Sequence, residues 1–308
     1  MIEKKSNPTI ISILIPTRDN ESDLIDCLSS IQKLDYNLKD IEVIIWDNNS
    51  NKDCKKRVKE FFETELKDYP FRLEFFENDS NYGVYTSRDE LLRMVTPEAK
   101  YVLSIDDDVI LPSNLLKDVL PLFSKDKSIG IIGPRIVYDD DPSETAHGAG
   151  FVNNCLGRYT TKDVQIVVEC DYVIGCCMLI RKQLIDEIGS FDRNYYISHG
   201  EVDFCLRAKK KGYRVVYDPS VVVRHRVDKG GTRSLERMYY VYRNKLLVIK
   251  KNWPIPQKWI ALFIYSFLAF PKAVINSILV NKKIDCREIK IIIIAMRDGW
   301  LNRFGKRV

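Results

Sequence analysis

The sequence predicts an α/β fold in which helices connect the strands of a parallel sheet, followed by a helical C-terminal region. Between Ile10 and Ile132, short β-rich apolar runs alternate with amphipathic stretches, as a parallel sheet with helical connections requires. From Ser234 onward the pattern changes to long helical segments. We therefore expect a sheet-based region over 1–233 and a helical appendage over 234–308.

The individual elements follow from the spacing of apolar residues. The first strands are predicted at Ile10–Ile15, Ile41–Ile45, Arg72–Phe76, Tyr101–Ile105 and Ile129–Ile132. Between the first two runs, apolar residues recur at the three- or four-residue spacing of one helix face, at Leu24, Leu28, Ile31 and Leu34. After Pro134 the alternation is less regular, with a strand expected over Tyr172–Ile180 and a helix over about Lys182–Ile188. The sheet is therefore expected to continue in a mixed manner.

The composition is that of an ordinary globular protein. The 308 residues include 48 Lys and Arg against 43 Asp and Glu, a net charge of +5 that is too small an excess to indicate a nucleic-acid partner. The eight cysteines form no CxxC pair, and MIEKKSNPTI lacks the long apolar stretch of a signal peptide. We interpret the cysteines as reduced, mostly buried thiols of a cytosolic protein.

One apolar stretch, Trp259–Val280, suggests contact with a membrane. Its 22 residues approach the length of a bilayer span, but Pro271 and Lys272 interrupt it. Lys and Arg flank the stretch, while Trp and Tyr lie within it, as in helices that rest among lipid headgroups. We expect an interfacial helix or a half-inserted hairpin, with a true span and plain core or dimer packing as the alternatives.

Carboxylates follow two of the predicted strands. Asp106, Asp107 and Asp108 come directly after YVLSI, and Asp47 comes after IEVIIW. Because ligands bind at the carboxyl ends of strands in α/β sheets, both places are candidate sites. Adjacent carboxylates repel one another, and a hard divalent cation would relieve that repulsion. The alternatives are a solvated acidic turn at 106–108 and ordinary loop chemistry at Asp47.

Seven phrases occur in the order and approximate spacing found in family 2 glycosyltransferases. They are ILIPTRDN, IIWDNNS, SNYGVYTSRDELL, YVLSIDDDVILP, YVIGCCMLIRKQLIDEIGSFD, GEVDFCLRAKKKGYRVVYDPSVVVRH and YRNKLLVIKKN. Over about residues 8–252 the chain resembles this family, and within it the rhamnosyltransferase-like members that build bacterial surface polysaccharides. The resemblance implies a GT-A fold, with a Rossmann-like and mostly parallel sheet. A nucleotide-binding half over about 8–133 would precede an acceptor-binding half over 134–233.

The resemblance also implies a donor site for a UDP-, dTDP- or GDP-sugar. The residues that would hold the nucleotide are Pro16, Thr17, Asp19, Asp47 and Arg88. Asp106 and Asp108 match the two acidic ends of a DxD motif, and Asp106 is expected to contact the donor as well. His225 stands where family members often carry a histidine near the metal. Asp106, Asp108 and His225 are thus the expected ligands of Mg²⁺ or Mn²⁺ bridging the diphosphate.

An inverting transfer needs a base that takes the proton of the attacking acceptor hydroxyl. The segment HGEVDFCLR offers Glu201 and Asp203 as catalytic carboxylates. In the family's usual EDxD wording the base aligns with Glu201, although Glu stands here in place of Asp. Asp203 stays open as the alternative base. It is also a candidate for a structural pair with Arg207, one helical turn later.

The sequence therefore predicts a metal-assisted, inverting glycosyltransferase. Its acceptor is expected to be a hydroxyl of a glycan, either lipid-linked or a growing polysaccharide. We expect it in the cytoplasm, peripherally on the inner face of the cell membrane. One alternative is a catalytically inactive GT-A-fold binding subunit of a polysaccharide assembly complex, against which the intact acidic residues argue. Another is a nucleotidyltransferase, but ILIPTRDN supplies no glycine-rich phosphate loop.

Overall fold

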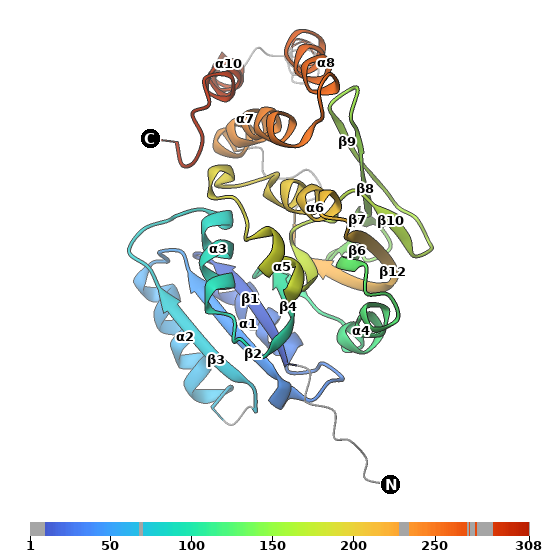
Figure 1. Cartoon of the computed structure of the whole chain (residues 1–308). Coiled ribbons are helices and arrows are strands. Elements are labelled where there is room, and N and C mark those ends of the chain that lie inside the picture. Colours follow the sequence, from blue (N-terminus) through green and yellow to red (C-terminus); the bar gives the residue numbers. More distant parts are fainter. Residues whose placement is uncertain are drawn as a thin grey trace.

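A computed structural model describes residues 10–67, 70–227, 234–269, 271, 275 and 286–307 of the chain. Figure 1 shows a twisted central sheet covered by helices, with the C-terminal helices stacked at one end. The α/β class and the mostly parallel sheet expected from the sequence are confirmed.

The central sheet has ten strands. They are β1 (Ile10–Thr17), β2 (Ile41–Asp47), β3 (Arg72–Glu77), β4 (Ala99–Ile105), β5 (Val109–Ile110), β6 (Ile129–Tyr138), β7 (Thr145–His147), β10 (Val168–Cys170), β11 (Cys177–Arg181) and β12 (Arg214–His225). Eight of them follow the order β10-β12-β6-β11-β4-β1-β2-β3, with β5 paired to β12 and β7 to β6. Strands β4, β1, β2 and β3 are parallel, whereas β11 inserts antiparallel between β4 and β6.

Helices cover both faces of this sheet because its central strands, such as β1, β2 and β4, are buried on both sides. The helices of the sheet region are α1 (Glu21–Ile31), α2 (Lys52–Thr64), α3 (Val84–Met94), α4 (Leu115–Lys125), α5 (Lys182–Ile188) and α6 (Gly200–Lys210), with the short turns η1 (Leu38–Asp40) and η2 (Arg193–Tyr195). Alternate residues of β1 show the division. Ile13 packs in a cluster with α1, α2 and α4, while Leu14 packs in a cluster with α3, α5 and α6.

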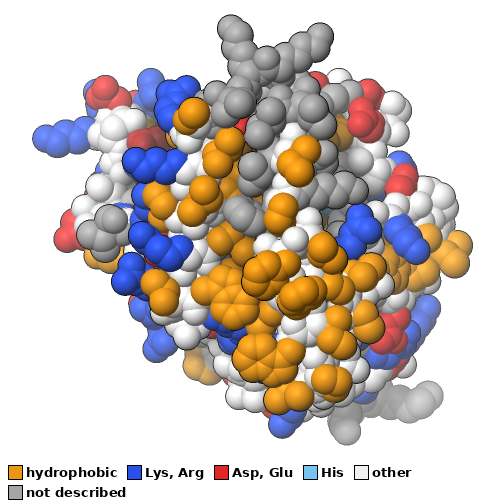
Figure 2. All heavy atoms as spheres, turned by 90° about the horizontal axis from the view of Figure 1, so that it is seen from above, with side chains coloured by type: hydrophobic (Ala, Val, Ile, Leu, Met, Phe, Trp, Pro, Cys, Tyr) orange, Lys and Arg blue, Asp and Glu red, His pale blue; other side chains and the backbone are white. Residues whose placement is uncertain are grey.

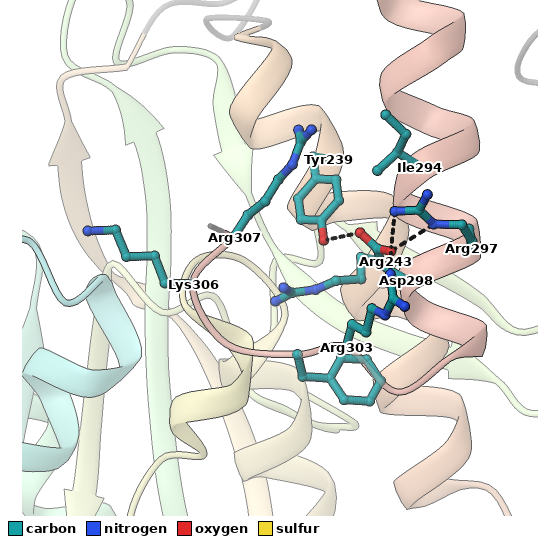
Figure 3. Close-up of a pocket in the computed structure, with 9 residues that line it drawn as sticks. Tyr239, Arg243, Ile294, Arg297, Asp298, Arg303, Lys306 and Arg307 are labelled. Atoms are coloured by element: carbon teal, nitrogen blue, oxygen red, sulfur yellow. Dashed lines mark hydrogen bonds and ion pairs between the residues drawn. The ribbon is translucent and has the colours of Figure 1, made fainter.

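The C-terminal helices pack onto the α6 side of the sheet region. They are α7 (Leu235–Asn252), α8 (Gln257–Ile264), the π-helical turn η3 (Tyr265–Ala269) and α10 (Cys286–Trp300). Leu246 and Ile249 of α7 share the core cluster that contains Phe204 of α6. A separate hairpin, β8 (Ala149–Asn153) with β9 (Arg158–Lys162), lies beside them. A pocket opens between α7, α10 and the C-terminal tail (Figure 3).

Hydrophobic side chains gather on the outer surface of α8, η3 and α10. Figure 2, seen from that end, shows them as a broad patch with Lys and Arg at its margins. We call it the apolar face, formed by Trp259, Ile260, Phe263, Phe267, Leu268, Ile293, Trp300 and Leu301. Much of the predicted apolar stretch, at 270, 272–274 and 276–280, lies outside the described residues. Among the helices that are described, none has both the length and the hydropathy to cross a bilayer.

Candidate active site

The carboxyl ends of β1, β2 and β4 meet at one edge of the sheet, as the sequence predicts. Thr17 at the end of β1 lies in register with Asp47 at the end of β2, and Asp106 follows β4 directly. A cleft of about 440 Å³ opens there. Its lining residues are Pro16, Thr17, Arg18, Asp19, Asn20, Asn48, Val84, Asp106, Asp107 and Asp108. Pro16, Thr17 and Asp19 therefore reach the cleft, as expected.

Hydrogen bonds connect the loop after β1 to the loop after β2. Asp19, in a left-handed conformation with φ of 51°, accepts hydrogen bonds from the backbone N–H of Asn51 at 2.7 Å and from its side-chain amide at 2.9 Å. Asp47 is buried and accepts the backbone N–H of Ser50 at 3.2 Å, while Lys55 Nζ lies 3.3 Å from its Oδ2. Asp47 thus stabilises the loop after β2 through these contacts. It is not among the residues that line the cleft.

Side chains of two other elements, β1 and α3, bind the aspartates after β4. Thr17 Oγ1 donates to Asp107 Oδ2 at 2.6 Å. Arg88 of α3 is buried and donates through Nη2 to Asp106 Oδ1 and to the Gly175 carbonyl, both at 2.6 Å. Burial raises the pKa of Asp106, and burial together with the neighbouring carboxylates raises the pKa of Asp107 to about 7. The cleft floor thus concentrates more negative charge than its own donors neutralise.

Asp106, Asp108 and His225 form a group that fits a divalent cation. One ligand atom from each residue lies within 4.8 Å of the others. His225, the last residue of β12, places Nε2 at 3.0 Å from Asp108 Oδ1. Burial opposes the charge of this imidazole, but Cys176 and Asp108 outweigh it and raise the pKa of His225 to about 11. Carboxylate oxygens and an imidazole nitrogen are donor atoms that divalent cations use in proteins.

Glu201 lies on the other side of Arg88. It sits in the first turn of α6, is buried, and accepts a hydrogen bond from the hydroxyl of Tyr85 on α3. Burial raises the pKa of Glu201, while the Tyr85 hydroxyl and the Arg88 charge favour its ionised form and limit the rise. A carboxyl whose pKa is raised toward neutrality is a stronger base than an ordinary glutamate.

Gly175 gives the Arg88 guanidinium its place between these two groups. A Cβ added at this position would lie 2.7 Å from Arg88 Nη1 and 3.4 Å from Glu201 Cβ. The next residue, Cys176, accepts the backbone N–H of Asp106 at 3.0 Å. The segment before β11 therefore contacts both Asp106 and the Arg88 guanidinium, and it lies close to Glu201.

Comparison with protein families agrees with this geometry. The family model described as Glycosyl transferase family 2 matches residues 12–189, more than half of the chain. This chain belongs to glycosyltransferase family 2. A second model, Glycosyl transferase family group 2, matches residues 101–280. Among curated relatives, the low-salt glycan biosynthesis hexosyltransferase Agl10 of Haloferax volcanii is 24% identical over 237 residues, which is 75% of this chain and 74% of Agl10.

Solved structures with the same fold extend over nearly all of this glycosyltransferase. The mannosyltransferase PcManGT from Pyrobaculum calidifontis, in complex with GDP-Man and Mn²⁺, aligns with a TM-score of 0.62 at 15% identity, covering 97% of this chain and 89% of that one. TarS 1–349 from S. aureus, in complex with UDP-GlcNAc, aligns with a TM-score of 0.61 at 17% identity, covering 94% and 80%. The fold is the GT-A fold that the sequence predicts.

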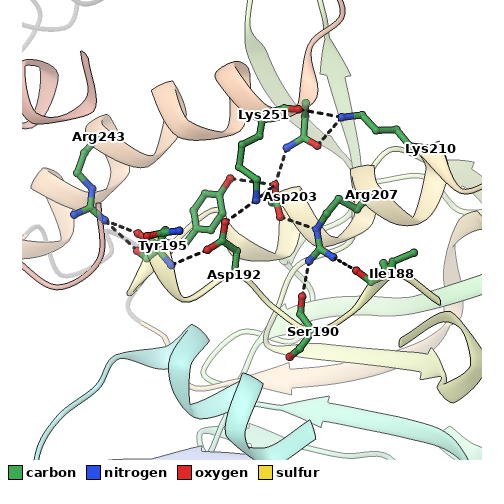
Figure 4. A network of polar contacts seen from close by, with 11 residues as sticks. Ile188, Ser190, Asp192, Tyr195, Asp203, Arg207, Lys210, Arg243 and Lys251 are labelled. Carbon is green, nitrogen blue, oxygen red and sulfur yellow. Dashed lines mark hydrogen bonds and ion pairs between the residues drawn. The ribbon is translucent and has the colours of Figure 1, made fainter. Parts of the chain in front are cut away.

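Within this glycosyltransferase, Asp203 faces a different environment from Glu201. Its carboxylate is fully buried and accepts from Arg207 Nε at 2.9 Å and Asn252 Nδ2 at 2.8 Å, with Lys251 Nζ at 3.0 Å (Figure 4). Burial works to raise the pKa of Asp203, but Arg207 and Lys251 outweigh it and the pKa is lowered. Such a carboxylate is a weak base, and its contacts tie α6 to the end of α7.

Two residues of the glycosyltransferase site escaped the sequence analysis. Tyr85 was not singled out, although it precedes Arg88 by three positions and, in a helix, would share its face. Asp107 was treated only as the middle of the DxD motif, yet it lines the cleft and binds Thr17. The positions of both residues relative to Arg88 and to the DxD motif were visible in the sequence. The sequence did not show which elements pack against them.

Proposed function

We propose that this glycosyltransferase moves a sugar, with inversion, from a nucleoside-diphosphate donor to an acceptor hydroxyl, using a divalent metal and Glu201 as base. The observation that carries the proposal is the placement of Arg88. Its guanidinium bonds Asp106 of the metal group, and Gly175 lies close to both that guanidinium and Glu201. A leaving-group site and a proton acceptor would thus lie near one buried cation.

The cleft side of the site would hold the donor. Pro16, Thr17 and Asp19 would contact the nucleoside, and Asp106, Asp108 and His225 would hold Mg²⁺ or Mn²⁺. The metal supplies charge neutralisation for the departing diphosphate. The solved relative with GDP-Man and Mn²⁺ supports a nucleotide-sugar and a metal of this class. Arg88 adds a fixed positive charge at the same end of the cleft, where negative charge develops during transfer.

Glu201 would take the proton of the acceptor hydroxyl as its oxygen attacks the anomeric carbon. The new bond joins that oxygen to the sugar, the bond to the nucleoside diphosphate breaks, and the proton passes to a Glu201 oxygen. Tyr85 holds one carboxylate oxygen and leaves the other for the acceptor. Asp203 is less suited to this role because Arg207, Lys251 and Asn252 already occupy its oxygens.

The acceptor would be a glycan hydroxyl on a lipid carrier or a growing polysaccharide, reached at the cytoplasmic surface of a membrane. The apolar face supports this placement, since it joins exposed Trp and Phe with Lys and Arg at its margins. Amphipathic surfaces of this kind rest in the headgroup layer of anionic membranes. The C-terminal helices would then hold the cleft beside membrane-bound acceptors.

The deciding experiment measures nucleoside diphosphate release from a panel of UDP-, dTDP- and GDP-sugars, with a membrane extract as acceptor source. For wild type we expect release with one class of donor, dependent on Mn²⁺ or Mg²⁺ and abolished by EDTA. Glu201→Gln keeps the shape and removes the base, so the rate is expected to fall about 10²–10⁴-fold. Asp108→Asn removes a metal ligand and is expected to lose the metal dependence together with the activity.

A matched control is Asp118→Asn, which changes an exposed aspartate on α4 whose carboxylate accepts a hydrogen bond from the side-chain amide of Asn114. It is expected to retain the wild-type rate. Donor binding without turnover in wild type, with any acceptor extract, would instead favour the inactive binding subunit. Turnover that survives both EDTA and Glu201→Gln would contradict the proposed mechanism.

A further inference from the structure

The pocket between α7, α10 and the C-terminal tail is strongly cationic. It has a volume of about 400 Å³, and Figure 3 shows side chains of both helices and the tail around it. Five of its lining residues are cations, Arg243, Arg297, Arg303, Lys306 and Arg307. Asp298 is the single acid among the lining residues. Five positive charges less one negative charge leave a surplus of four.

Asp298 cannot neutralise these cations. Its carboxylate accepts from the Tyr239 hydroxyl at 3.0 Å and from Arg297 Nη2 at 2.8 Å, with Arg303 Nη1 at 3.7 Å. Arg243 and Arg307 make no ion pair within the described part of the chain. The guanidinium of Arg307 lies over the ring of Tyr239, 4.9 Å from its centroid. The pocket therefore presents guanidinium donors that still have room for an anion.

Arg243 is the most telling of these cations because it is almost fully buried. It donates to the carbonyls of Gly305 at 2.6 Å and Asn194 at 3.0 Å, and to the side-chain oxygen of Asn244, all of them neutral acceptors. Burial lowers its pKa. A buried charge without a counter-ion is costly, and an anion in the adjoining pocket would lower that cost.

The pocket lies between the apolar face and the reaction site. On the outer side, Ile294 and Arg297 of α10 line it, and the same helix contributes Ile293 and Trp300 to the apolar face. On the inner side, the carbonyl of Asn194 that Arg243 binds belongs to the segment leading into α6 and Glu201.

The tail makes a second connection, this time to the donor cleft. Lys306 Nζ donates to the carbonyl of Asn81 at 2.9 Å, and the Asn81 side chain accepts from Asn48, which lines the cleft. A ligand in the pocket would therefore contact the C-terminal tail, which is hydrogen-bonded through Asn81 to a residue of the donor cleft.

We propose that this pocket binds the phosphate or diphosphate group of a lipid-linked acceptor. The inference rests on the proposed function and adds the site that recognises the carrier. Phosphate suits the pocket because it brings two or more negative charges and several acceptor oxygens, which planar guanidinium groups bind in pairs. A lipid carrier suits it because its chain could leave along the apolar face while its sugar extends toward Glu201.

The test compares two double variants of the full-length enzyme. Arg303→Gln with Arg307→Gln removes two exposed cations of the pocket and leaves buried Arg243 in place. Lys258→Gln with Lys290→Gln removes the same charge from α8 and α10, outside the pocket lining. The probes are phosphatidylcholine vesicles carrying a few per cent of polyprenyl diphosphate, the same vesicles carrying the neutral polyprenol, and free inorganic pyrophosphate.

We expect wild type to prefer polyprenyl diphosphate over polyprenol vesicles, and the pocket variant to lose that preference by about tenfold or more. The α8/α10 variant is expected to keep it. Equal loss in both variants would overturn the proposal in favour of general attraction to anionic surfaces. Tight binding of free pyrophosphate without preference for the lipid form would overturn the lipid carrier and indicate a site for a free anion.

A second measurement separates this proposal from the proposed function. Release of nucleoside diphosphate by slow donor hydrolysis, without acceptor, uses the cleft alone and is expected to be equal in wild type and the pocket variant. If wild type shows no donor turnover but binds diphosphate vesicles through the pocket, the proposed function fails and the lipid-phosphate site stands. If donor turnover is normal and pocket-dependent binding is absent, the pocket proposal fails alone.

Discussion

Burial and two neighbouring side chains set the pKa of Glu201, the proposed base. Burial raises the pKa of its carboxyl, and the hydrogen bond from Tyr85 together with the charge of Arg88 acts in the opposite direction. A base must be deprotonated to act, so activity is expected to fall as the pH drops through the pKa of Glu201. Because that pKa is raised, the fall comes above the range of an ordinary glutamate, about 4.3.

Removing the Tyr85 hydroxyl is expected to raise the pH at which activity falls. Tyr85→Phe deletes a hydrogen bond that favours the ionised carboxylate but keeps the burial, so the pKa of Glu201 rises. The acidic limb of the kcat/KM profile should therefore shift to higher pH. Tyr82→Phe is the control, since Tyr82 is exposed and its hydroxyl bonds Asp79. A shift toward lower pH in Tyr85→Phe, or the same shift in both variants, would contradict the role given to Tyr85.

Individual site residues were predictable to different degrees. Asp106 and Asp108 stand out as adjacent carboxylates after a buried strand, and Glu201 came from the ordered phrases. Sequence left Glu201 and Asp203 as alternatives because both lie in one helical turn. The pairing of Asp203 with Arg207 lies within α6 and follows from the spacing, whereas the approach of Glu201 to Arg88 depends on how α6 is rotated against α3. That rotation is set by non-local packing, which one sequence does not display.

Asp203 connects α6 to neighbouring elements. Its contacts with Arg207, Lys251 and Asn252 join α6 to the last turn of α7, and the Tyr195 hydroxyl approaches the same carboxylate at 3.3 Å. Because α6 also carries Glu201, contacts that hold the helix at this point also hold the proposed base in place. Under the proposed mechanism, Asp203 would be a positioning residue.

Asp203→Asn is expected to lower the free energy of unfolding by about 3 kcal/mol, because it leaves two cations around a neutral buried side chain. We take the lower end of the usual range since Lys251 retains some access to solvent. The measurement is urea unfolding at pH 7. Asp186→Asn, which breaks an exposed pair with Lys182 on α5, is the control and should cost about 0.5 kcal/mol or less.

The difference in free energy of unfolding between wild type and Asp203→Asn should also depend on pH. The folded-state pKa of Asp203 is lowered, so its contribution to stability is present above the unfolded pKa of about 3.9 and is lost as the pH falls through the folded value. The gap between wild type and Asp203→Asn should therefore narrow only below about pH 4. A gap that is constant down to acid pH, or absent at pH 7, would argue against a charged Asp203.

Some elements followed from the sequence and others did not. The strands β1, β2, β3, β4 and β6 lie where the apolar runs predict them, and the helix expected over Lys182–Ile188 is α5. The strand expected from Tyr172 begins only at Cys177. The residues before it leave the ladder, and the carbonyls of Gly175 and Cys176 bind Arg88 and Asp106 instead. The β8–β9 hairpin was missed because its short strands lie in a polar, turn-rich stretch.

The apolar face and the candidate active site lie in different parts of the molecule. The C-terminal helices stack on the α6 side of the sheet and turn the apolar face outward (Figures 1 and 2). The indole N–H of Trp300 on α10 donates to the Ser266 hydroxyl of η3 at 3.1 Å, which joins the two halves of that face. Membrane contact would therefore involve this surface as one unit.

Charges placed in the apolar face should release the protein from vesicles. Trp259→Glu with Phe263→Glu puts two carboxylates where two exposed aromatic side chains stood, and the partition coefficient on anionic vesicles should fall about tenfold or more. Ile166→Glu with Val167→Glu is the control, because it charges two exposed apolar residues between β9 and β10. Co-sedimentation measures both, and equal losses would rule out a specific docking face.

The position of β11 also bears on how the chain is made. Cys177 of β11 pairs with Ile105 of β4, and β11 alone separates β4 from β6 in the sheet. At the usual 5–20 residues per second, the ribosome needs roughly 4–14 s between these two strands. During that interval the nascent β4 has an open, hydrophobic edge, a surface prone to mispairing. We expect the nascent chain to depend on chaperones at this stage. Asp106 is expected to reach its final position only after Cys176 has been synthesised.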